Sequence, residues 1–425
     1  MLRLRPGCRL GLTIVVFWGA VRPGRDAAIL KGAKMDLSDT PEEGRFRSGV
    51  RKFLEESLPR LSWPQPEDLV ERVRFWQQWQ RMVFEGGYAG LTWPEEYGGQ
   101  GFDERLRAVF GEECDRAGAP ERLNIIGEDF GGPTVVHFGT DEQKKRYLRP
   151  ILTGEEIWCQ LFSEPEAGSD LASLRTKATK VEGGWRISGQ KIWTSRAQIA
   201  AHAILLARTG GGERHRGITF FLLPMDSDGI TVRPLAHMLG EAEFNEVFLD
   251  EVFVPDSAVV GAVDGGWKVA MGTLGFERVA IATGRVNTGK AIGDIIDDIR
   301  GRGDAAGRPL GADPLVRQRV ADLWSRALVH RTISQRVVTG AAADGPPGPV
   351  TSIGKLYFCP LVEDLADFRL SLEPCGGQFG LDDEPNETRA WLRLANQARG
   401  TAIAGGSTFI QRNIVAERIL GMPRS

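Results

Sequence analysis

The stretch RTKATKVEGGWRIS, residues 175–188, decides the fold class that this sequence predicts. Two runs rich in strand-forming residues flank the turn Glu182-Gly183-Gly184, a pattern typical of a β-hairpin. Since the apolar period here is two, residues between about 156 and 262 are expected to form an antiparallel β unit. The other strands are expected at residues 203–208, 218–223, 230–233 and 246–253.

Helical patterns lie on both sides of this unit. Thr40, Pro41 and Glu43 form a capping-box start for a helix near the beginning of the chain. Beyond the β unit, an apolar stripe from Val316 to Val337 predicts one long helix. The order of helices, strands and helices predicts an α+β fold and does not suit a βαβαβ nucleotide-binding fold.

The chain has 425 residues, which allows roughly two to four domains. The changes of periodicity set the expected boundaries of an N-terminal helical domain, a middle β-domain and a C-terminal helical domain. These are placed at residues 35–155, 156–262 and 263–425.

Residues 1–34 are interpreted as a disordered upstream extension, with Met35 as the start of the protein. A targeting signal is the alternative, because three arginines precede an apolar run at residues 11–21. That run is too short to cross a bilayer, which takes about 20 apolar residues. We expect a cytoplasmic protein that does not act at a membrane.

The charge balance argues against nucleic acid or an anionic membrane as the main partner. Lys and Arg total 53 against 56 Asp and Glu, so the net charge is -3. Five scattered cysteines without a CxxC pair are interpreted as reduced thiols. The five histidines show no metal-ligand spacing, so no metal site is expected.

Two segments combine residue types suited to a flat ligand. SEPEAGSD at 163–170 predicts a tight turn with exposed backbone N–H groups, although a turn that links domains fits equally well. GQKIWTS at 189–195 ends a hairpin with an indole and two hydroxyls. Such a group can stack on a ring system and hydrogen-bond its edge, whereas a lone Trp is usually a core residue.

With these segments in view, the chain from Met35 onward resembles the acyl-CoA dehydrogenases. A looser resemblance is to bacterial members that include steroid side-chain enzymes. It is carried by two segments, WCQLFSEPEAGSD (158–170) and GRPLGADPLVRQR (307–319). The family fold implied is an N-terminal helical domain, a middle β-domain and a C-terminal four-helix bundle. The six collinear matches are TWPEEYGG (92–99), GGPTVVHFGTDEQKKRYLRPILTGE (131–155), FSEPEAGSDLASLRTKA (162–178), GQKIWTS (189–195), FNEVFLDEVFVP (244–255) and IQRNIVAERILGMP (410–423).

The resemblance implies FAD as the cofactor and an acyl-CoA as the substrate. Ser169 would lie near the CoA portion of the substrate. One side of the isoalloxazine ring would be lined by Gln160, Phe162 and Ser163. The other side would be covered by Trp193, Thr194 and Ser195.

The catalytic base departs from the commonest family pattern. Many members carry a Glu shortly before the IQR segment, where this chain has Gly405. In other members the base is a Glu directly before an Arg on the first C-terminal helix, which Glu277 and Arg278 match. We therefore expect Glu277 to be the base and Arg278 to tune its charge, with a solvated charge pair as the alternative. The Gly405 N–H would bind the thioester carbonyl.

Contacts to the far end of the flavin also differ from the family pattern. The chain has Arg308 in GRPLGAD, and Glu373 where a Gln usually precedes a Gly-Gly turn. An acidic side chain near a diphosphate is unfavourable unless it points away or bonds the adenine. This asymmetry is similar to heteromeric α2β2 dehydrogenases in which only some sites hold FAD.

Three functions stay open on this sequence. The first is a dehydrogenase that forms a trans-2-enoyl-CoA and passes electrons to an electron-transfer flavoprotein. The second is a non-catalytic partner subunit, and the third is a flavin monooxygenase or oxidase on the same fold. The protein is expected to be a homo-oligomer or an α2β2 assembly with a related chain.

Overall fold

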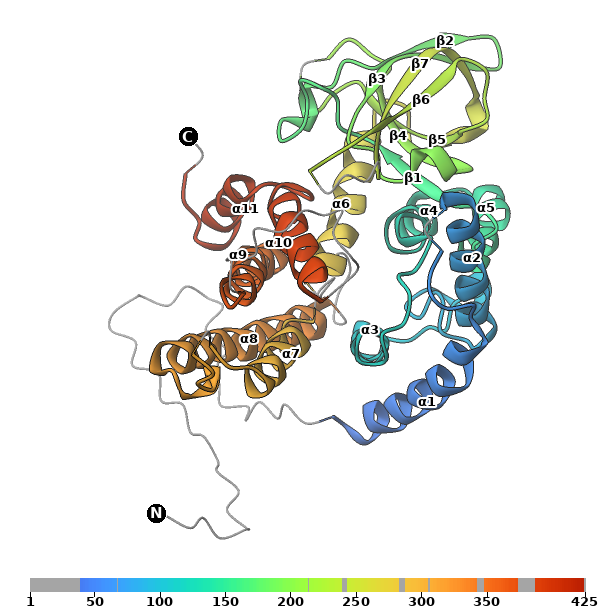
Figure 1. The fold of residues 1–425 in the computed structure, drawn as a ribbon. Coiled ribbons are helices and arrows are strands. Elements are labelled where there is room, and N and C mark those ends of the chain that lie inside the picture. Colours follow the sequence, from blue (N-terminus) through green and yellow to red (C-terminus); the bar gives the residue numbers. More distant parts are fainter. Residues whose placement is uncertain are drawn as a thin grey trace. The chain divides into compact units, whose positions relative to one another are not determined.

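The structure, a computed structural model, describes residues 39–66, 68–212, 214–238, 243–282, 287–304, 306–341, 348–373 and 387–423. The interpretation of residues 1–34 as a disordered extension concerns residues outside these ranges. Along the chain, helices come first, strands second and helices again last (Figure 1). None of the helices in the described ranges is long and apolar enough to cross a membrane.

The first N-terminal helix begins at the capping box that the sequence predicts. The Thr40 N–H donates to Glu43 Oε2 at 2.7 Å, and the Glu43 N–H donates to Thr40 Oγ1 at 3.2 Å. A second capping box, between Thr140 and Gln143, starts the fifth helix. The helices are α1 (Pro41–Ser57), α2 (Leu69–Glu85), α3 (Glu104–Ala117), α4 (Gly132–Phe138) and α5 (Asp141–Thr153).

The middle of the chain forms one sheet in the order β6-β7-β3-β2-β4-β5-β8, and β1 pairs with β4. The predicted hairpin is confirmed, because β2 and β3 pair antiparallel around the turn at Glu182 and Gly183. The strands are β1 (Trp158–Leu161), β2 (Lys177–Val181), β3 (Gly184–Lys191), β4 (His202–Arg208), β5 (Ile218–Pro224), β6 (Ile230–Leu235), β7 (Phe244–Pro255) and β8 (Val259–Val260).

The sheet is not wholly antiparallel, so that part of the prediction is wrong. β1 runs parallel to β4, and β2 meets β4 in a parallel bridge between Lys177 and Arg208. Parallel neighbours need a long crossover connection, which the β2–β3 hairpin and the loop before β4 supply here. The strand pattern shows alternation but not which strand lies beside which.

The two faces of the sheet contribute to different cores. On β4, Ile204 and Leu206 pack with the N-terminal helices, whereas Ala203 and Leu205 pack with other strands of the sheet. This is the two-residue alternation of a strand that is buried on both sides. One face of the β-domain is therefore fixed against the helical domain.

The C-terminal helical domain confirms the predicted long helix, since residues 316–337 lie within one helix. Four of its helices supply the core residues Ile292, Leu323, Leu365 and Trp391. The helices are α6 (Gly266–Ala282), α7 (Thr288–Gly301), α8 (Pro314–Ala341), α9 (Val350–Ser371), α10 (Glu387–Ile403) and α11 (Thr408–Ile414). The core comes from α7, α8, α9 and α10, as expected for a four-helix bundle.

A buried carboxylate joins α1 to α3. The side chain of Glu113 is 2% exposed and accepts hydrogen bonds from Arg47 and Arg51 of α1 at 2.9 Å. Arg116 donates to it at 2.6 Å. Burial raises the pKa of Glu113, but the hydrogen bonds from Arg51, Arg47 and Arg116 outweigh this and lower it to about 2.

Replacing this carboxylate should destabilise the protein. We expect Glu113→Gln to lower the free energy of unfolding by about 2–3 kcal/mol at pH 7. A depressed folded-state pKa stabilises above the unfolded value of 4.5, and that contribution disappears as the pH falls towards about 2. The difference between variant and wild type should therefore shrink from pH 5 to pH 2, as urea unfolding would measure.

The matched control is Glu56→Gln, which breaks an exposed pair with Lys52 at 3.8 Å on α1. We expect it to change stability by less than about 0.5 kcal/mol. Equal losses for the two variants would contradict a special role for Glu113.

Candidate active site

The two candidate ring-binding segments lie in contact. β1 leads into Phe162 and Ser163, and β3 ends at Lys191 just before Trp193. The Ile192 N–H donates to the Ser163 carbonyl at 3.0 Å. The structure therefore brings the segments 160–163 and 191–195 side by side.

A buried ion pair holds this junction. The side chains of Lys191 and Glu164 are 0% and 7% exposed, and their charged atoms lie 2.8 Å apart. Lys191 Nζ also donates to the Phe162 carbonyl at 3.1 Å. The Arg175 and Thr176 N–H groups donate to the Glu164 carboxylate at 2.6 and 2.9 Å. No local sequence pattern indicates this pair, because its two residues lie 27 positions apart.

Burial and mutual attraction shift the pKa values of both members of this pair. Burial lowers the pKa of Lys191 to about 8, although the Glu164 charge opposes this effect. Burial raises the pKa of Glu164, but Lys191 and the backbone donors lower it more. The Glu164 carboxyl is therefore ionised at neutral pH and suited to a structural role.

Among the predicted ring-binding residues, two carry a buried polar atom without a hydrogen-bond partner in the described part of the chain. They are Gln160 Oε1 on β1 and Thr194 Oγ1. The Thr194 backbone is fixed, because its N–H donates to the Asn245 carbonyl at 3.1 Å and its carbonyl accepts from Asn245 Nδ2 at 3.0 Å. Buried polar atoms are normally hydrogen-bonded, so these two fit a site for a polar ligand.

Trp193 combines exposure with an unusual backbone. Its φ is 60°, the residue is 60% exposed, and its indole forms a T-shaped pair with the Phe244 ring at 6.0 Å between ring centroids. A positive φ is uncommon for a bulky residue and is concentrated at functional sites. An exposed indole on such a loop is suited to covering a flat ligand. Ser195, two residues further on, is half-buried.

Arg196 anchors this loop to the N-terminal domain and was missed by the sequence analysis. Its Nη1 donates to the Leu123 carbonyl at 2.9 Å, and its Nη2 pairs with Glu121 at 2.7 Å. Its guanidinium lies 5.0 Å from the centroid of the Trp76 ring. These are long-range contacts, and no local pattern around Arg196 signals them.

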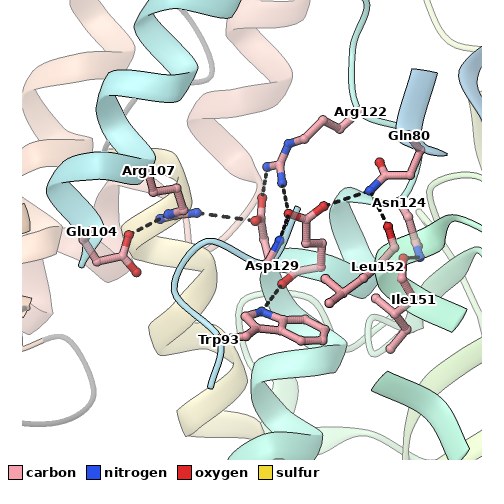
Figure 2. A network of polar contacts seen from close by, with 11 residues as sticks. Gln80, Trp93, Glu104, Arg107, Arg122, Asn124, Asp129, Ile151 and Leu152 are labelled. Atoms are coloured by element: carbon pink, nitrogen blue, oxygen red, sulfur yellow. Dashed lines mark hydrogen bonds and ion pairs between the residues drawn. The ribbon is translucent and has the colours of Figure 1, made fainter. Parts of the chain in front are cut away.

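The anchor point is itself held by a charged network, shown in Figure 2. Arg122 pairs with Asp129 at 2.8 Å and with Glu128 at 2.9 Å. Both carboxylates lie on the π-helical segment Ile126–Gly131, and Trp93 Nε1 donates to the Glu128 carbonyl at 3.2 Å. π-helical turns are often found at functional sites. Here the turn supports the backbone that Arg196 binds.

Glu277 lies on the inward face of α6. It is 8% exposed, so it is not the solvated residue of the alternative interpretation. One turn earlier, Thr273 is fully buried and its hydroxyl lies 2.8 Å from the hydroxyl of Thr134 on α4. Burial lowers the pKa of the neighbouring Arg278, Glu277 raises it, and Arg418 lowers it further.

The other predicted residues lie on separate turns. Ser169 is exposed, just beyond the turn closed by the bridge between Glu164 and Ala167. Gly405 lies between α10 and α11, where its φ is +63° and that of Gly406 is +93°. Its carbonyl accepts a hydrogen bond from Gln411 Nε2 at 2.9 Å.

The carboxylate of Glu373 is ion-paired with arginines of the C-terminal domain. It accepts hydrogen bonds from Arg302 at 3.0 and 3.1 Å, from Thr388 at 3.0 Å, and from Arg369. Burial raises the pKa of Glu373, but these partners lower it to about 2. Arg308 is exposed and pairs with Asp304 at 2.6 Å. Both residues therefore have partners within the chain.

One cavity of about 820 Å³ is lined by Arg146, Glu156, His202 and Asp226 among others, and none of the predicted site residues lines it. Its imidazole and carboxylate face each other at 3.5 Å between His202 Nδ1 and Glu156 Oε2. In the described ranges, no three His, Cys, Asp or Glu side chains are grouped to hold a metal ion.

Comparison with known proteins identifies the family. The models of the N-terminal, middle and C-terminal domains of acyl-CoA dehydrogenases match residues 40–155, 159–252 and 264–420. Acyl-CoA dehydrogenase IpdE1 of Mycobacterium tuberculosis is 38% identical over 389 residues, which cover 89% of this chain and 97% of that protein.

Two solved structures share the fold. The ChsE4-ChsE5 complex of Mycobacterium tuberculosis gives a TM-score of 0.79 at 27% identity, and the Tcur3481-Tcur3483 steroid acyl-CoA dehydrogenase gives 0.80 at 28%. Both matches cover 92% of this chain and 100% of the other. The predicted three-domain fold is confirmed, and the chain belongs to the acyl-CoA dehydrogenase family.

Proposed function

We propose that this chain catalyses the α,β-desaturation of an acyl-CoA thioester to a trans-2-enoyl-CoA, with FAD as its cofactor. Acyl-CoA dehydrogenases generally bind FAD. The observation that carries the proposal is the carboxyl group of Glu277, buried on α6 directly before Arg278. A carboxylate in such a position is suited to taking a proton from a carbon acid.

The residues around the β1–β3 junction fit a flavin. Gln160, Phe162 and Ser163 would line one side of the ring, and Trp193, Thr194 and Ser195 would cover the other. The partnerless Gln160 Oε1 and Thr194 Oγ1 support this assignment, because a bound ring with polar edges would satisfy them. When bound, FAD supplies the acceptor for the hydride that leaves the β-carbon.

The protein's own residues would perform the proton transfer. The thioester acidifies the α-carbon, and Glu277 would take the α-proton, since shielding from water raises the basicity of a carboxylate. Arg278 would tune the charge of Glu277. The Gly405 N–H would bind the thioester oxygen, where negative charge develops. Ser169 would contact the CoA portion.

The base assignment makes a direct prediction. We expect Glu277→Gln to lower the rate of desaturation by about 1000-fold, because an amide cannot accept the proton. Flavin content should stay unchanged, and Glu277→Asp, which keeps a carboxylate but shortens its reach, should lose less. Single-turnover reduction of the bound flavin by acyl-CoA measures this rate. A normal rate for Glu277→Gln would refute the assignment.

The flavin assignment is tested separately at Thr194. Removing its hydroxyl in Thr194→Val should weaken FAD binding by about tenfold, the effect of one lost hydrogen bond. Titration of the flavin-free protein with FAD gives the affinity. Thr179→Val, at an exposed position on β2, is the matched control and should change nothing. Equal affinities for all three proteins would argue against a flavin contact at Thr194.

The substrate class and the partners are inferred from the relatives. We propose an acyl-CoA of steroid origin, an electron-transfer flavoprotein as acceptor, and a homo-oligomer or an α2β2 assembly. A solved relative is described as a steroid acyl-CoA dehydrogenase, and another as a complex of two chains. Gly405 favours a second candidate, a non-catalytic partner subunit, because the base of many members is missing there.

An anaerobic titration of the purified protein with acyl-CoAs of increasing size separates these candidates. We expect the bound flavin to lose its visible absorption with one size class of acyl-CoA. Only an acyl group that fills its binding site places the α- and β-carbons correctly for the reaction. A colourless protein that gains flavin only with a co-expressed related chain would favour the partner-subunit candidate.

A further inference from the structure

We propose that Lys355 is a positioning residue, which turns the amides of the Ala404–Gly406 turn toward the thioester carbonyl of the substrate. The proposal rests on the proposed function and extends it to a residue in α9. It concerns the stabilisation of negative charge on the substrate oxygen.

Three consecutive carbonyls of this turn bind buried donors. Lys355 is 2% exposed, and its ammonium donates to the Ala404 carbonyl and, at 2.6 Å, to the Gly406 carbonyl. Gln411, which is 1% exposed, donates from Nε2 to the Gly405 carbonyl at 2.9 Å. The carbonyl oxygens of the turn are thus directed to Lys355 and Gln411.

The direction of the amides follows from peptide geometry. In a trans peptide, the carbonyl of one residue and the N–H of the next point in opposite directions. Because the Ala404 and Gly405 carbonyls bind Lys355 and Gln411, the N–H groups of Gly405 and Gly406 point away from these donors. Neither N–H donates a hydrogen bond to any residue that the structure describes.

The turn requires glycine. The positive φ values of Gly405 and Gly406, +63° and +93°, disfavour residues with a Cβ. A Cβ on Gly406 would lie 2.7 Å from Gln411 Nε2. Two adjacent amides without acceptors favour a ligand oxygen that carries negative charge.

The charge of Lys355 acts in the same direction. When the α-proton moves to the Glu277 carboxylate, the electron pair of the C–H bond shifts toward the thioester and places negative charge on its oxygen. A buried cation behind the turn polarises its peptide groups and favours this charge, because a low-dielectric environment screens it weakly. Lys355 would thereby lower the apparent pKa of the α-carbon without touching the substrate.

The test compares two CoA ligands on the full-length protein with bound flavin. Acetoacetyl-CoA carries the thioester carbonyl and ionises to an enolate, whereas S-butyl-CoA is a thioether without that carbonyl. We expect Lys355→Met and Gln411→Met each to weaken acetoacetyl-CoA binding by about tenfold and S-butyl-CoA binding by less than about twofold. The pH at which bound acetoacetyl-CoA ionises should rise by about one unit in Lys355→Met.

The control is Lys290→Met, which removes an exposed lysine paired with Asp294 in the same domain. It should change neither affinity. Equal losses of both ligands in the Lys355 and Gln411 variants, or an unchanged ionisation pH, would overturn the positioning role alone. A wild-type protein that binds neither ligand would overturn the proposed function together with this inference.

Discussion

The buried ion pair between Glu164 and Lys191 is the interaction on which the candidate site depends. It joins the end of β1 to the end of β3, and it is almost fully removed from water. Desolvating two charges is costly, so such a pair is stable only when the remaining hydrogen-bonding atoms are satisfied. The Phe162 carbonyl and the N–H groups of Arg175 and Thr176 provide that here.

Polar contacts join the three domains around the candidate site. The loop after Lys191 reaches the N-terminal domain through Arg196 and the Leu123 carbonyl. The N-terminal domain in turn contacts α6 through Thr134 and Thr273, one turn before Glu277. The ring-binding loops and the proposed base are therefore tied to the same helical domain, and a shift of either would disturb its packing.

Local features were predictable from the sequence, whereas long-range pairings were not. The caps at Thr40 and the β2–β3 hairpin depend on residues within a few positions of each other, so their patterns identify them. The parallel pairing of β1 with β4 depends on residues distant in the chain. The burial of Glu277 was equally undetermined, because adjacent charges on a helix are usually solvated. The family resemblance, not the pattern, pointed to it.

Gly405 stands where many family members are expected to carry the catalytic Glu, and this difference affects the backbone of the turn as well as the position of the base. With the base proposed on α6, the turn between α10 and α11 no longer has to carry a side chain, and its two glycines adopt positive φ values. That conformation leaves two adjacent amides free of acceptors in the described structure, while Lys355 and Gln411 bind the carbonyls behind them. Proton removal would then come from α6, and charge stabilisation would come from the turn between α10 and α11.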